Sequence, residues 1–404
     1  MRISLQSILF FVSMSLVVVL GHIYLYRRLF RDTAKHPHWR LAGVVLMALL
    51  ATLMTSWWIL PRLLPQGTAT VIISRLNWFW MGAATYLLLA VLSLGGLRQL
   101  TGWLKRRRVA EAAPPTPAPA AEVDEERRQF LARATAGVAL AATSGVASYG
   151  AWRAFHPPVV NEVAVRLPGL PRALDGFTLI QLSDVHVGPL IQRRFMDAVV
   201  EQCNGLKGDL VCITGDLVDG RVAHLAHGVG ALSNLRSRHG TYFVTGNHEY
   251  YSGDEEWTEA LTRMGVTVLR NRHVRIGEPG ASFDLVGVDD WRAHRSGYPR
   301  ERSYDLAAAT AGRDPSRASV LLAHQPAGWR EHALKAGMGL QLSGHTHGGQ
   351  FFPFNLVVSA VWEHDAGLFR EEDSHLYVSR GTGFWGPPLR VAAPPEIVKV
   401  TLLA

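Results

Sequence analysis

The sequence predicts a helical membrane region followed by an α/β domain. Long apolar runs fill the first quarter of the chain, and short apolar strands alternate with helical segments from Pro157 onward. Side chains of the kinds that bind metal ions follow several of those strands. With 404 residues, of which 48% are hydrophobic, the chain is long enough for two or three domains.

The N-terminal part contains three apolar runs, at residues 5–26, 41–60 and 76–97. Each run is close to the roughly 20 residues that an α-helix needs to cross a bilayer. Tryptophans lie near the ends of the runs, as aromatic residues do at membrane interfaces, and these are Trp57, Trp58, Trp78 and Trp80. We therefore predict three transmembrane helices within residues 1–104. Three buried helices of a soluble bundle are the alternative, which the run lengths disfavour.

Basic residues are concentrated in the same part of the chain. The protein carries 41 Lys and Arg against 33 Asp and Glu, which gives a net charge of +8. Residues 1–130 contain 15 of the basic residues and 6 of the acidic residues, so the positive excess lies in this part of the chain. The C-terminal part is close to neutral, and no nucleic-acid partner is expected for it. The connections at 27–40 and 98–108 are rich in Arg and Lys, and such loops stay in the cytoplasm. The N-terminus is therefore expected on the outer side.

An Ala- and Pro-rich stretch separates the third run from a fourth, and we place a cytoplasmic linker at residues 105–128. Residues 129–152 form either a fourth transmembrane helix or the apolar part of a signal that resembles a twin-arginine export signal, because Arg127 and Arg128 precede them. Both alternatives place residues 153–404 on the periplasmic or extracellular side of an inner (plasma) membrane that the chain crosses several times.

Five apolar strands further along the chain are each followed by residues that can bind metal ions. In chain order these residues are Asp184 and His186, Asp216 and Asp219, Asn247 with His248 and Glu249, His324, and the pair His345 and His347. Because α/β sheets build their sites at the carboxyl ends of the strands, we expect these side chains to lie together. At an i, i+2 spacing on extended backbone, the last two histidines are expected to point to the same side. Asp, His and Asn suit Mn, Fe or Zn.

The order of these motifs resembles the calcineurin-like metallophosphoesterase superfamily. Asp-x-His, Gly-Asp-x-x-Asp, Gly-Asn-His-Glu, a later His and Gly-His-Thr-His follow one another within residues 158–404. The form Gly-His-Thr-His-Gly-Gly-Gln is similar to the membrane-associated phosphodiesterase branch of that superfamily, including members with a transmembrane region before the domain. The resemblance implies a four-layer α/β/β/α sandwich after the membrane region.

The resemblance also implies two divalent metal ions. It assigns a first ion to Asp184, His186 and His347, a second to Asn247, His324 and His345, and the bridging position to Asp216. His248 is the implied catalytic residue, as a general acid or charge stabiliser beside the leaving oxygen. Asp219 and Glu249 either orient histidines or are simple surface carboxylates. Arg390 is expected to form structural pairs rather than to bind substrate.

The apolar runs together with this resemblance imply a membrane-anchored hydrolase that cleaves a phosphodiester or pyrophosphate bond by attack of a metal-activated hydroxide. The expected partners are the membrane and a phosphate-ester substrate, either lipid-linked or a small molecule. One alternative is a lipid-A-pathway UDP-diacylglucosamine pyrophosphohydrolase, which the outward orientation disfavours because UDP-sugars are made in the cytoplasm. Another is a non-catalytic membrane scaffold, which the intact ligand set disfavours.

Overall fold

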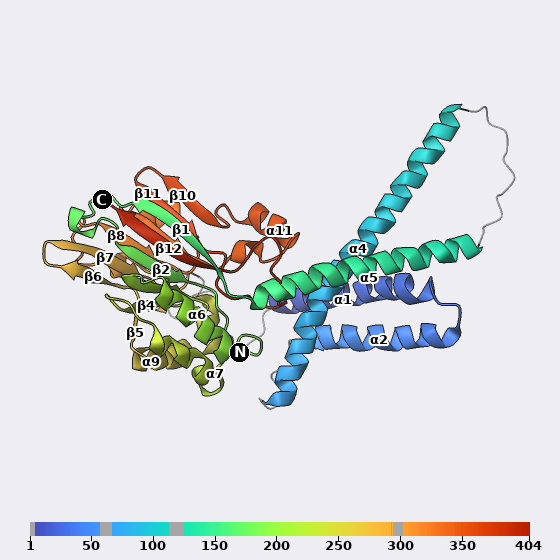
Figure 1. Cartoon of the computed structure of the whole chain (residues 1–404), viewed down its shortest axis with the longest axis horizontal. Coiled ribbons are helices and arrows are strands. Elements are labelled where there is room, and N and C mark those ends of the chain that lie inside the picture. Colours follow the sequence, from blue (N-terminus) through green and yellow to red (C-terminus); the bar gives the residue numbers. More distant parts are fainter. Residues whose placement is uncertain (1–4, 57–66, 113–124, 292, 294–301) are drawn as a thin grey trace. The chain divides into compact units, whose positions relative to one another are not determined.

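The chain forms two compact units, Met1–Tyr149 and Gly150–Ala404, in the computed structural model (Figure 1). The structure describes residues 5–56, 67–112, 125–291, 293 and 302–404. Trp57, Trp58 and residues 113–124 of the predicted linker lie outside the described residues. The two units are described separately below.

The N-terminal unit consists of long helices. Their bounds are α1 (Leu5–Tyr26) with a π-helical turn η1 (Arg27–Arg31), α2 (Pro37–Ser56), α4 (Thr68–Ala112) and α5 (Glu125–Phe155). Four helices are long and apolar enough to cross a membrane, by length and composition, in the described part of the chain. Leu25 of α1, Met47 of α2 and Leu87 of α4 are buried together in a small core between the helices.

Helix α4 is longer than the sequence patterns indicated. It continues through the basic residues 105–108, which the sequence pattern assigns to the start of the linker. Lys and Arg are good helix formers, and the first proline after the apolar run is Pro114, so nothing in the local sequence ends the helix earlier. The helical conformation also resumes at Glu125, inside the predicted linker.

The last turn of α5 belongs to the second unit. Ala154 is fully buried in the core of that unit, and the ring of Phe155 lies edge-on to Phe384 with the ring centroids 5.1 Å apart. The backbone oxygen of Gly150 accepts a hydrogen bond from the backbone N–H of Arg390 at 3.0 Å. A side chain at position 150 would collide with Val391, because an added Cβ would lie 2.9 Å from its methyl group. The apolar helix therefore ends as a packed part of the second unit.

Two six-stranded sheets form the centre of the second unit (Figure 1). The first has the order β1 (Val159–Arg166), β12 (Glu396–Leu403), β2 (Thr178–Leu182), β3 (Leu210–Thr214), β4 (Thr241–Val244) and β5 (Val266–Val268). The second has the order β10 (Gly367–Glu371), β11 (Ser374–Val378), β9 (Leu340–Ser343), β8 (Ser319–Leu322), β7 (Ala281–Gly287) and β6 (Arg272–Glu278). Strands β2 to β5 are parallel, as are β7, β8, β9 and β11, whereas β6 and β10 run antiparallel at the two edges of the second sheet.

The sheets pack face to face, and helices cover their outer faces. Leu179 of β2 contributes to the core between the sheets, whereas its neighbour Ile180 packs under the outer helices. Strands buried on both faces read as continuous apolar runs, which is why the sequence shows no alternation there. The covering helices are α6 (Arg193–Gly205), α7 (Val222–Val229) and α9 (Asp254–Arg263) on the first sheet, and α10 (Leu306–Thr310) and η6 (Trp329–Leu334) on the second. The predicted four-layer α/β/β/α arrangement is confirmed.

Candidate metal centre

The five strands that precede the predicted ligands come from both sheets. β2, β3 and β4 belong to the first sheet, and β8 and β9 belong to the second. The loops after these strands are joined by backbone hydrogen bonds, from Asp184 N–H to the Gly215 oxygen at 3.0 Å and from Gly344 N–H to the His324 oxygen at 2.8 Å. The His345 N–H donates to Asp184 Oδ1 at 2.9 Å and joins the loops of the two sheets, so the carboxyl ends of these strands meet at one edge of the sandwich.

The backbone at this edge is unusual. Five of the seven predicted ligands have positive φ angles between 50° and 72°, namely Asp184, His186, Asp216, His345 and His347. Non-glycine residues rarely adopt this left-handed conformation, and such strain collects at functional sites. It persists here because the packing is close: a Cβ at Gly344 would lie 2.1 Å from a carboxylate oxygen of Asp184.

The expected orientation of the last two histidines is wrong. His345 and His347 do not lie on extended backbone, because the chain turns sharply after β9 and enters the short helical turn η7 (His347–Gly349). The two imidazoles consequently face different neighbours. His345 Nδ1 lies 3.1 Å from His324 Nε2, whereas His347 Nε2 lies 3.1 Å from His186 Nε2.

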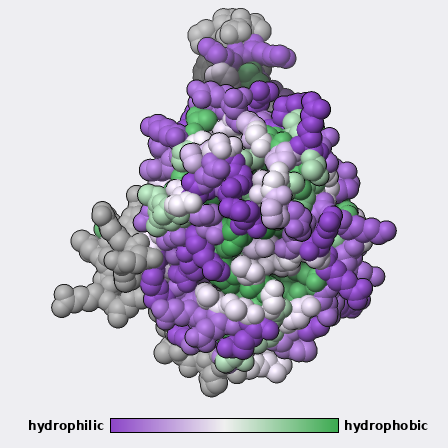
Figure 2. All heavy atoms as spheres, turned by 90° about the vertical axis from the view of Figure 1, so that its left-hand side faces the viewer, coloured by the Kyte–Doolittle hydropathy of each residue, from purple (hydrophilic) through white to green (hydrophobic). Residues whose placement is uncertain are grey.

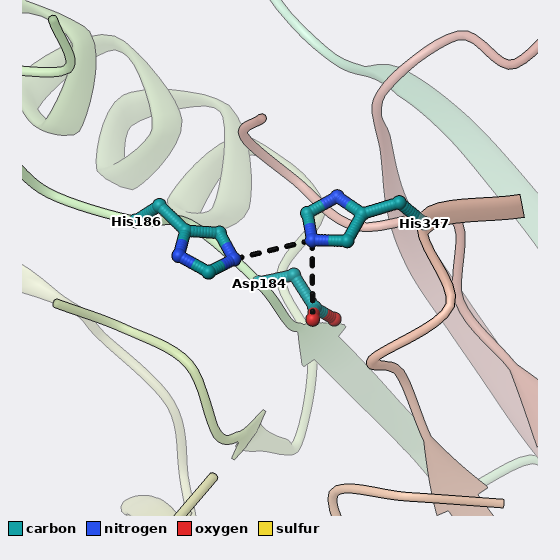
Figure 3. Close-up of side chains that lie close together, drawn as sticks. All are labelled: Asp184, His186 and His347. Atoms are coloured by element: carbon teal, nitrogen blue, oxygen red, sulfur yellow. Dashed lines mark hydrogen bonds and ion pairs between the residues drawn. The ribbon is translucent and has the colours of Figure 1, made fainter. Parts of the chain in front are cut away.

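Asp184, His186 and His347 form the first group of side chains, which converge from two segments of the chain, the loop after β2 and the turn η7 (Figure 3). His347 Nε2 lies 3.1 Å from His186 Nε2 and 3.5 Å from Asp184 Oδ1. All three side chains are buried. Two facing imidazole nitrogens at this distance cannot both carry a proton, so the group either shares one proton or holds a cation.

A carboxylate sets the tautomer of His186. Its Nδ1 lies 2.9 Å from Asp219 Oδ1. Burial opposes ionisation of Asp219, but the charges of His186 and His248 outweigh it and hold the pKa of Asp219 well below its usual range. An ionised carboxylate only accepts, so Nδ1 of His186 donates and its Nε2 keeps a lone pair directed into the group.

His347 is held from behind by Arg390. Arg390 is buried and donates to the backbone oxygens of Gly383, Arg380 and His347, as well as from Nη2 to Nδ1 of His347 at 3.1 Å. Burial and the charge of Arg390 lower the pKa of His347 well below its usual range, so the ring is neutral. Because Nδ1 accepts from Arg390, the single ring proton lies on Nε2, between His347 and His186, when no cation takes its place. The structure thus agrees with the expectation that Arg390 pairs structurally, and its buried side chain is not placed to meet a substrate.

Asp216, His324 and His345 form the second group. His324 Nε2 lies 3.1 Å from Asp216 Oδ2 and 3.1 Å from His345 Nδ1. His324 Nδ1 donates to the Thr214 backbone oxygen at 2.8 Å, which again leaves Nε2 directed into the group. Burial opposes the charge on Asp216, but His324 and His248 hold its pKa well below the usual range.

Asp216 connects the two groups. Its Oδ2 lies 3.1 Å from Nε2 of His324 in the second group and 3.9 Å from Nε2 of His186 in the first. Its other oxygen, Oδ1, accepts a hydrogen bond from the backbone N–H of His248 at 2.9 Å. One carboxylate therefore faces both groups from a fixed position.

Asn247 completes the predicted set. It begins helix α8 (Asn247–Ser252), and its Oδ1 is buried with no hydrogen-bond partner among the described residues. A buried amide oxygen without a partner is costly, and a cation at this position would satisfy it. Burial also raises the pKa of Asp184, although His324 opposes this, and a nearby cation would offset the cost of that buried charge. These residues fit divalent ions in donor type.

His248 lies at the outer side of the centre. Its Nδ1 is 2.6 Å from Asp219 Oδ1, its Nε2 is 3.9 Å from Asp216 Oδ2, and its side chain is 16% exposed. Burial lowers the pKa of His248, but Asp216 and Asp219 outweigh it and raise this pKa to about 9 in the metal-free chain. His186, Asp219 and His248 are close enough to hold an ion as a third group. However, both histidines use Nδ1 to donate to Asp219, so a hydrogen-bond network explains this contact better.

The structure resolves the two roles that the sequence left open for Asp219 and Glu249. Asp219 contacts two imidazoles, as described above. Glu249 is buried, and its carboxylate accepts hydrogen bonds from the backbone N–H groups of Gly246 at 2.6 Å, Leu217 at 2.8 Å and Asp216 at 2.9 Å. It therefore ties the loop after β3 to the loop after β4 rather than orienting a histidine, so the predicted role holds for Asp219 and not for Glu249, and neither residue is a simple surface carboxylate.

Sequence reasoning missed the aromatic neighbours of the centre. The ring centroid of His248 lies 5.4 Å from that of Tyr251 and 5.7 Å from that of Trp385. The ring of Trp362 lies 5.3 Å from that of His345. Nothing in the local sequence around Trp385 points to a residue 137 positions earlier, so a single sequence carries no signal for this contact.

Known proteins share these features. The calcineurin-like phosphoesterase family matches residues 177–349. A "Transmembrane protein with metallophosphoesterase domain" from Danio rerio is 32% identical over 99% of this chain and 90% of its own length, and the Bos taurus protein of that name is 34% identical over 96% and 87%. An "Uncharacterized metallophosphoesterase" from Helicobacter pylori is 38% identical over 62% of this chain and 67% of its own. Among solved structures, the NAD nucleotidase of Haemophilus influenzae aligns with 51% of this chain and 45% of its own, at 15% identity and a TM-score of 0.37.

Proposed function

This chain belongs to the calcineurin-like metallophosphoesterase family, and we propose that it is a membrane-anchored phosphoesterase with two divalent metal ions. The reaction would be hydrolysis of a phosphodiester or pyrophosphate bond. The observation that carries the proposal is Asp216, whose Oδ2 faces an imidazole nitrogen of each side-chain group, at 3.1 Å and 3.9 Å. A shared carboxylate is the typical bridge between two cations.

The seven ligands divide between the two ions according to the groups described above. The first ion would take Asp184, His186 and His347, the second would take Asn247, His324 and His345, and Asp216 would contact both. This mixture of nitrogen and oxygen donors suits Mn, Fe or Zn. When bound, the ions supply Lewis-acid activation of the phosphate and of the attacking water.

The protein's own residues would hold the centre and move the proton. Asp219 fixes the rings of His186 and His248 through their Nδ1 atoms. His248 then presents Nε2 toward the centre, and Asp216 and Asp219 favour its protonated form. A protonated imidazole in this position can donate to the leaving oxygen as the phosphorus–oxygen bond breaks. The partial exposure of His248 leaves room for a substrate beside it.

The apolar helices support a position at a membrane. Four helices in the described part of the chain are long and apolar enough to cross one, and the two relatives that match nearly the whole chain are named transmembrane proteins. The basic connections favour an orientation with the phosphoesterase unit on the outer side.

A scaffold without activity remains the alternative from another class of function. It would not need the orphaned Asn247 oxygen or the fixed histidine tautomers.

Metal analysis of the full-length protein tests the proposal. Purified protein should contain two transition-metal equivalents and should hydrolyse bis(p-nitrophenyl) phosphate. Asp216→Asn removes the bridging charge, so we expect loss of at least one ion and of most activity. The matched control is Asp197→Asn, which alters an exposed acid on α6 that pairs with Arg193. If the Asp216 variant keeps both ions and full activity, the two-ion mechanism is wrong, and an inactive wild-type protein over a panel of phosphoesters would favour the scaffold.

A further inference from the structure

Helix α11 (Phe354–Val361) exposes a row of apolar side chains, whereas the sheet-covering helices α6, α7, α9 and α10 bury apolar residues in the core of the unit. Of its residues, Val358 is buried in the unit, while the apolar residues around it face outward. The exposed apolar residues of α11 lie beside two others, Phe352 and Trp385. The solvent exposure of these side chains is between 46% and 73%, and the full set is Phe352, Phe354, Leu356, Val357, Val361 and Trp385. No charged residue occurs between positions 351 and 361. A surface helix of a water-soluble domain normally carries charge on its outer face, so these six residues, which we call the apolar rim, need another explanation.

Hydrogen bonds of Gln350 and of the backbone join the two segments that carry the apolar rim. Gln350 donates from Nε2 to the Trp385 backbone oxygen at 2.9 Å, and its Oε1 accepts from the Trp385 N–H at 2.9 Å. The Phe352 N–H donates to the Val391 oxygen at 3.0 Å. These bonds fix α11 beside the segment at residues 384–391, so the rim is one rigid surface.

The rim borders the metal centre. Trp385 lies against His248, with ring centroids 5.7 Å apart. Trp362, the residue after α11, lies 5.3 Å from the ring of His345 in the second ligand group. A molecule resting on the rim would therefore lie beside the proposed general acid and one proposed ligand.

The rim also adjoins the end of an apolar helix. The last turn of α5 packs against residues 384–391 through Phe155 and Phe384, and through the bond between Gly150 and Arg390. Trp152 and Phe155 on this turn are themselves exposed. At about 1.5 Å per residue, the 31-residue α5 exceeds the ~30 Å hydrocarbon core, so its last turn would emerge at the membrane interface. Chain connectivity then keeps the rim close to the bilayer surface.

The opposite face of the same unit has a different character. Figure 2 shows the face that lies at the left of Figure 1, around the β6–β7 end of the sheets, and its side chains are predominantly hydrophilic. The rim lies instead beside the last turn of α5, which packs against residues 384–391. Aromatic and aliphatic side chains in such a position are typical of surfaces that rest in a membrane interface.

We propose that the apolar rim lies in the interface of the bilayer that α5 crosses, so that the metal centre receives a phosphoester that is itself a lipid of that bilayer. The substrate class rests on the proposed function, whereas the membrane contact of the rim does not. The occupant is the lipid surface. A second copy of the chain is the competing occupant, and the experiment distinguishes the two.

Lipid quenching locates the rim in the full-length protein. Single cysteines at Val357 and Val361 would be labelled with an environment-sensitive fluorophore, since the native Cys203 and Cys212 are free and buried. In liposomes, we expect spin-labelled lipids to quench both labels. The control label replaces Glu259, an exposed residue of α9 that lies on the other side of the unit, and it should not be quenched (Figure 1). Equal quenching at all three positions would overturn the proposal. So would labels at 357 and 361 that are shielded from water but not quenched by the lipids, and that become exposed when the protein is diluted, because a second copy of the chain would then cover the rim.

A matched pair of substrates tests the link to catalysis. Leu356→Glu with Val361→Glu places charge on the rim without touching a proposed ligand or His248. In proteoliposomes, hydrolysis of a p-nitrophenyl phosphodiester of a long-chain alcohol should fall at least tenfold, while hydrolysis of soluble bis(p-nitrophenyl) phosphate stays unchanged. Unchanged hydrolysis of both would contradict a lipid substrate entering over the rim. Equal loss of both would show a damaged fold, in which case the quenching result decides. If the wild-type protein cleaves neither, the proposed function fails, while the quenching result still decides the membrane contact.

Discussion

The carboxylate of Asp219 accepts a hydrogen bond from His248 Nδ1 at 2.6 Å. The same oxygen lies 2.9 Å from His186 Nδ1. One acid thus orients both a proposed metal ligand and the proposed proton donor, and it fixes the tautomer of each ring. A change at Asp219 should therefore affect metal binding and proton transfer together.

Asp219→Asn tests this shared role. The amide keeps the size of the side chain, but it removes the negative charge that both Nδ1–H groups face. We expect a loss of about 10–100-fold in metal affinity or activity, as is usual when the partner of a metal-bound histidine is changed. Metal affinity by competition with a chelator and turnover of bis(p-nitrophenyl) phosphate provide the measurements. Unchanged values for both would mean that Asp219 does not orient the rings, and Asp197→Asn again serves as the control for a lost surface charge.

His248 should produce the high-pH limb of the activity profile. A general acid works in its protonated form, and the folded chain raises the pKa of His248 to about 9 without metal. Bound cations repel the imidazolium and lower this pKa, so activity should fall with rising pH at a midpoint below about 9. His248→Gln should lack this limb and should lose about 10²–10⁴-fold in activity at neutral pH on an alkyl phosphodiester.

A good leaving group provides the internal control for His248. A nitrophenyl leaving group needs little protonation, so the defect of His248→Gln should shrink on that substrate. The metal content of the variant should match the wild type, because His248 is not a ligand in this mechanism. A variant that loses metal would instead place His248 in the third side-chain group, with His186 and Asp219.

Glu249→Gln should destabilise the loops that carry Asp216 and Asn247. The Glu249 carboxylate accepts backbone N–H groups from both loops, and a glutamine would turn its own NH₂ group toward some of them. Hydrogen bonds to charged groups contribute about 1.5–3 kcal/mol each, and burial raises the pKa of Glu249 to about 8. We therefore expect a loss of about 2–4 kcal/mol in the free energy of unfolding above that pH, where the carboxylate is charged, and a smaller loss below it. Thermal unfolding of the full-length protein with Glu259→Gln as the exposed control measures this. A melting temperature equal to that of the control would contradict the role of Glu249.

The sequence predicted the parts of the site that local patterns encode. The apolar runs before Asp184, Asp216 and His324 are strands in the structure, and the side chains that follow them meet at one edge. The left-handed backbone at His345 and His347 was not predicted, because it depends on the close approach of Gly344 to Asp184. The exact ligand assignment stays a prediction.

Contacts between distant segments were also out of reach. Arg390 lies 43 residues after His347, and the sequence gives no indication that its guanidinium meets that ring. The end of α4 differs from the predicted boundary for a local reason. A boundary drawn from hydrophobicity stops where charges begin, whereas the helix itself continues through Lys and Arg, which are good helix formers.

The orientation in the membrane can be tested at two points of the chain. The basic residues 105–108 lie near the end of α4, and positively charged ends stay in the cytoplasm. Because α5 is apolar enough to cross the membrane once more, the phosphoesterase unit should then lie outside. A reporter that fluoresces only in the cytoplasm should be active when fused after Ala112, and alkaline phosphatase, which is active only outside, should be active when fused after Ala404. Replacing residues 105–108 by alanine should weaken this preference, because the charge that retains the end of α4 inside is gone. Cytoplasmic activity of the fusion after Ala404 would contradict the orientation, and with it the outer location that we propose for the metal centre.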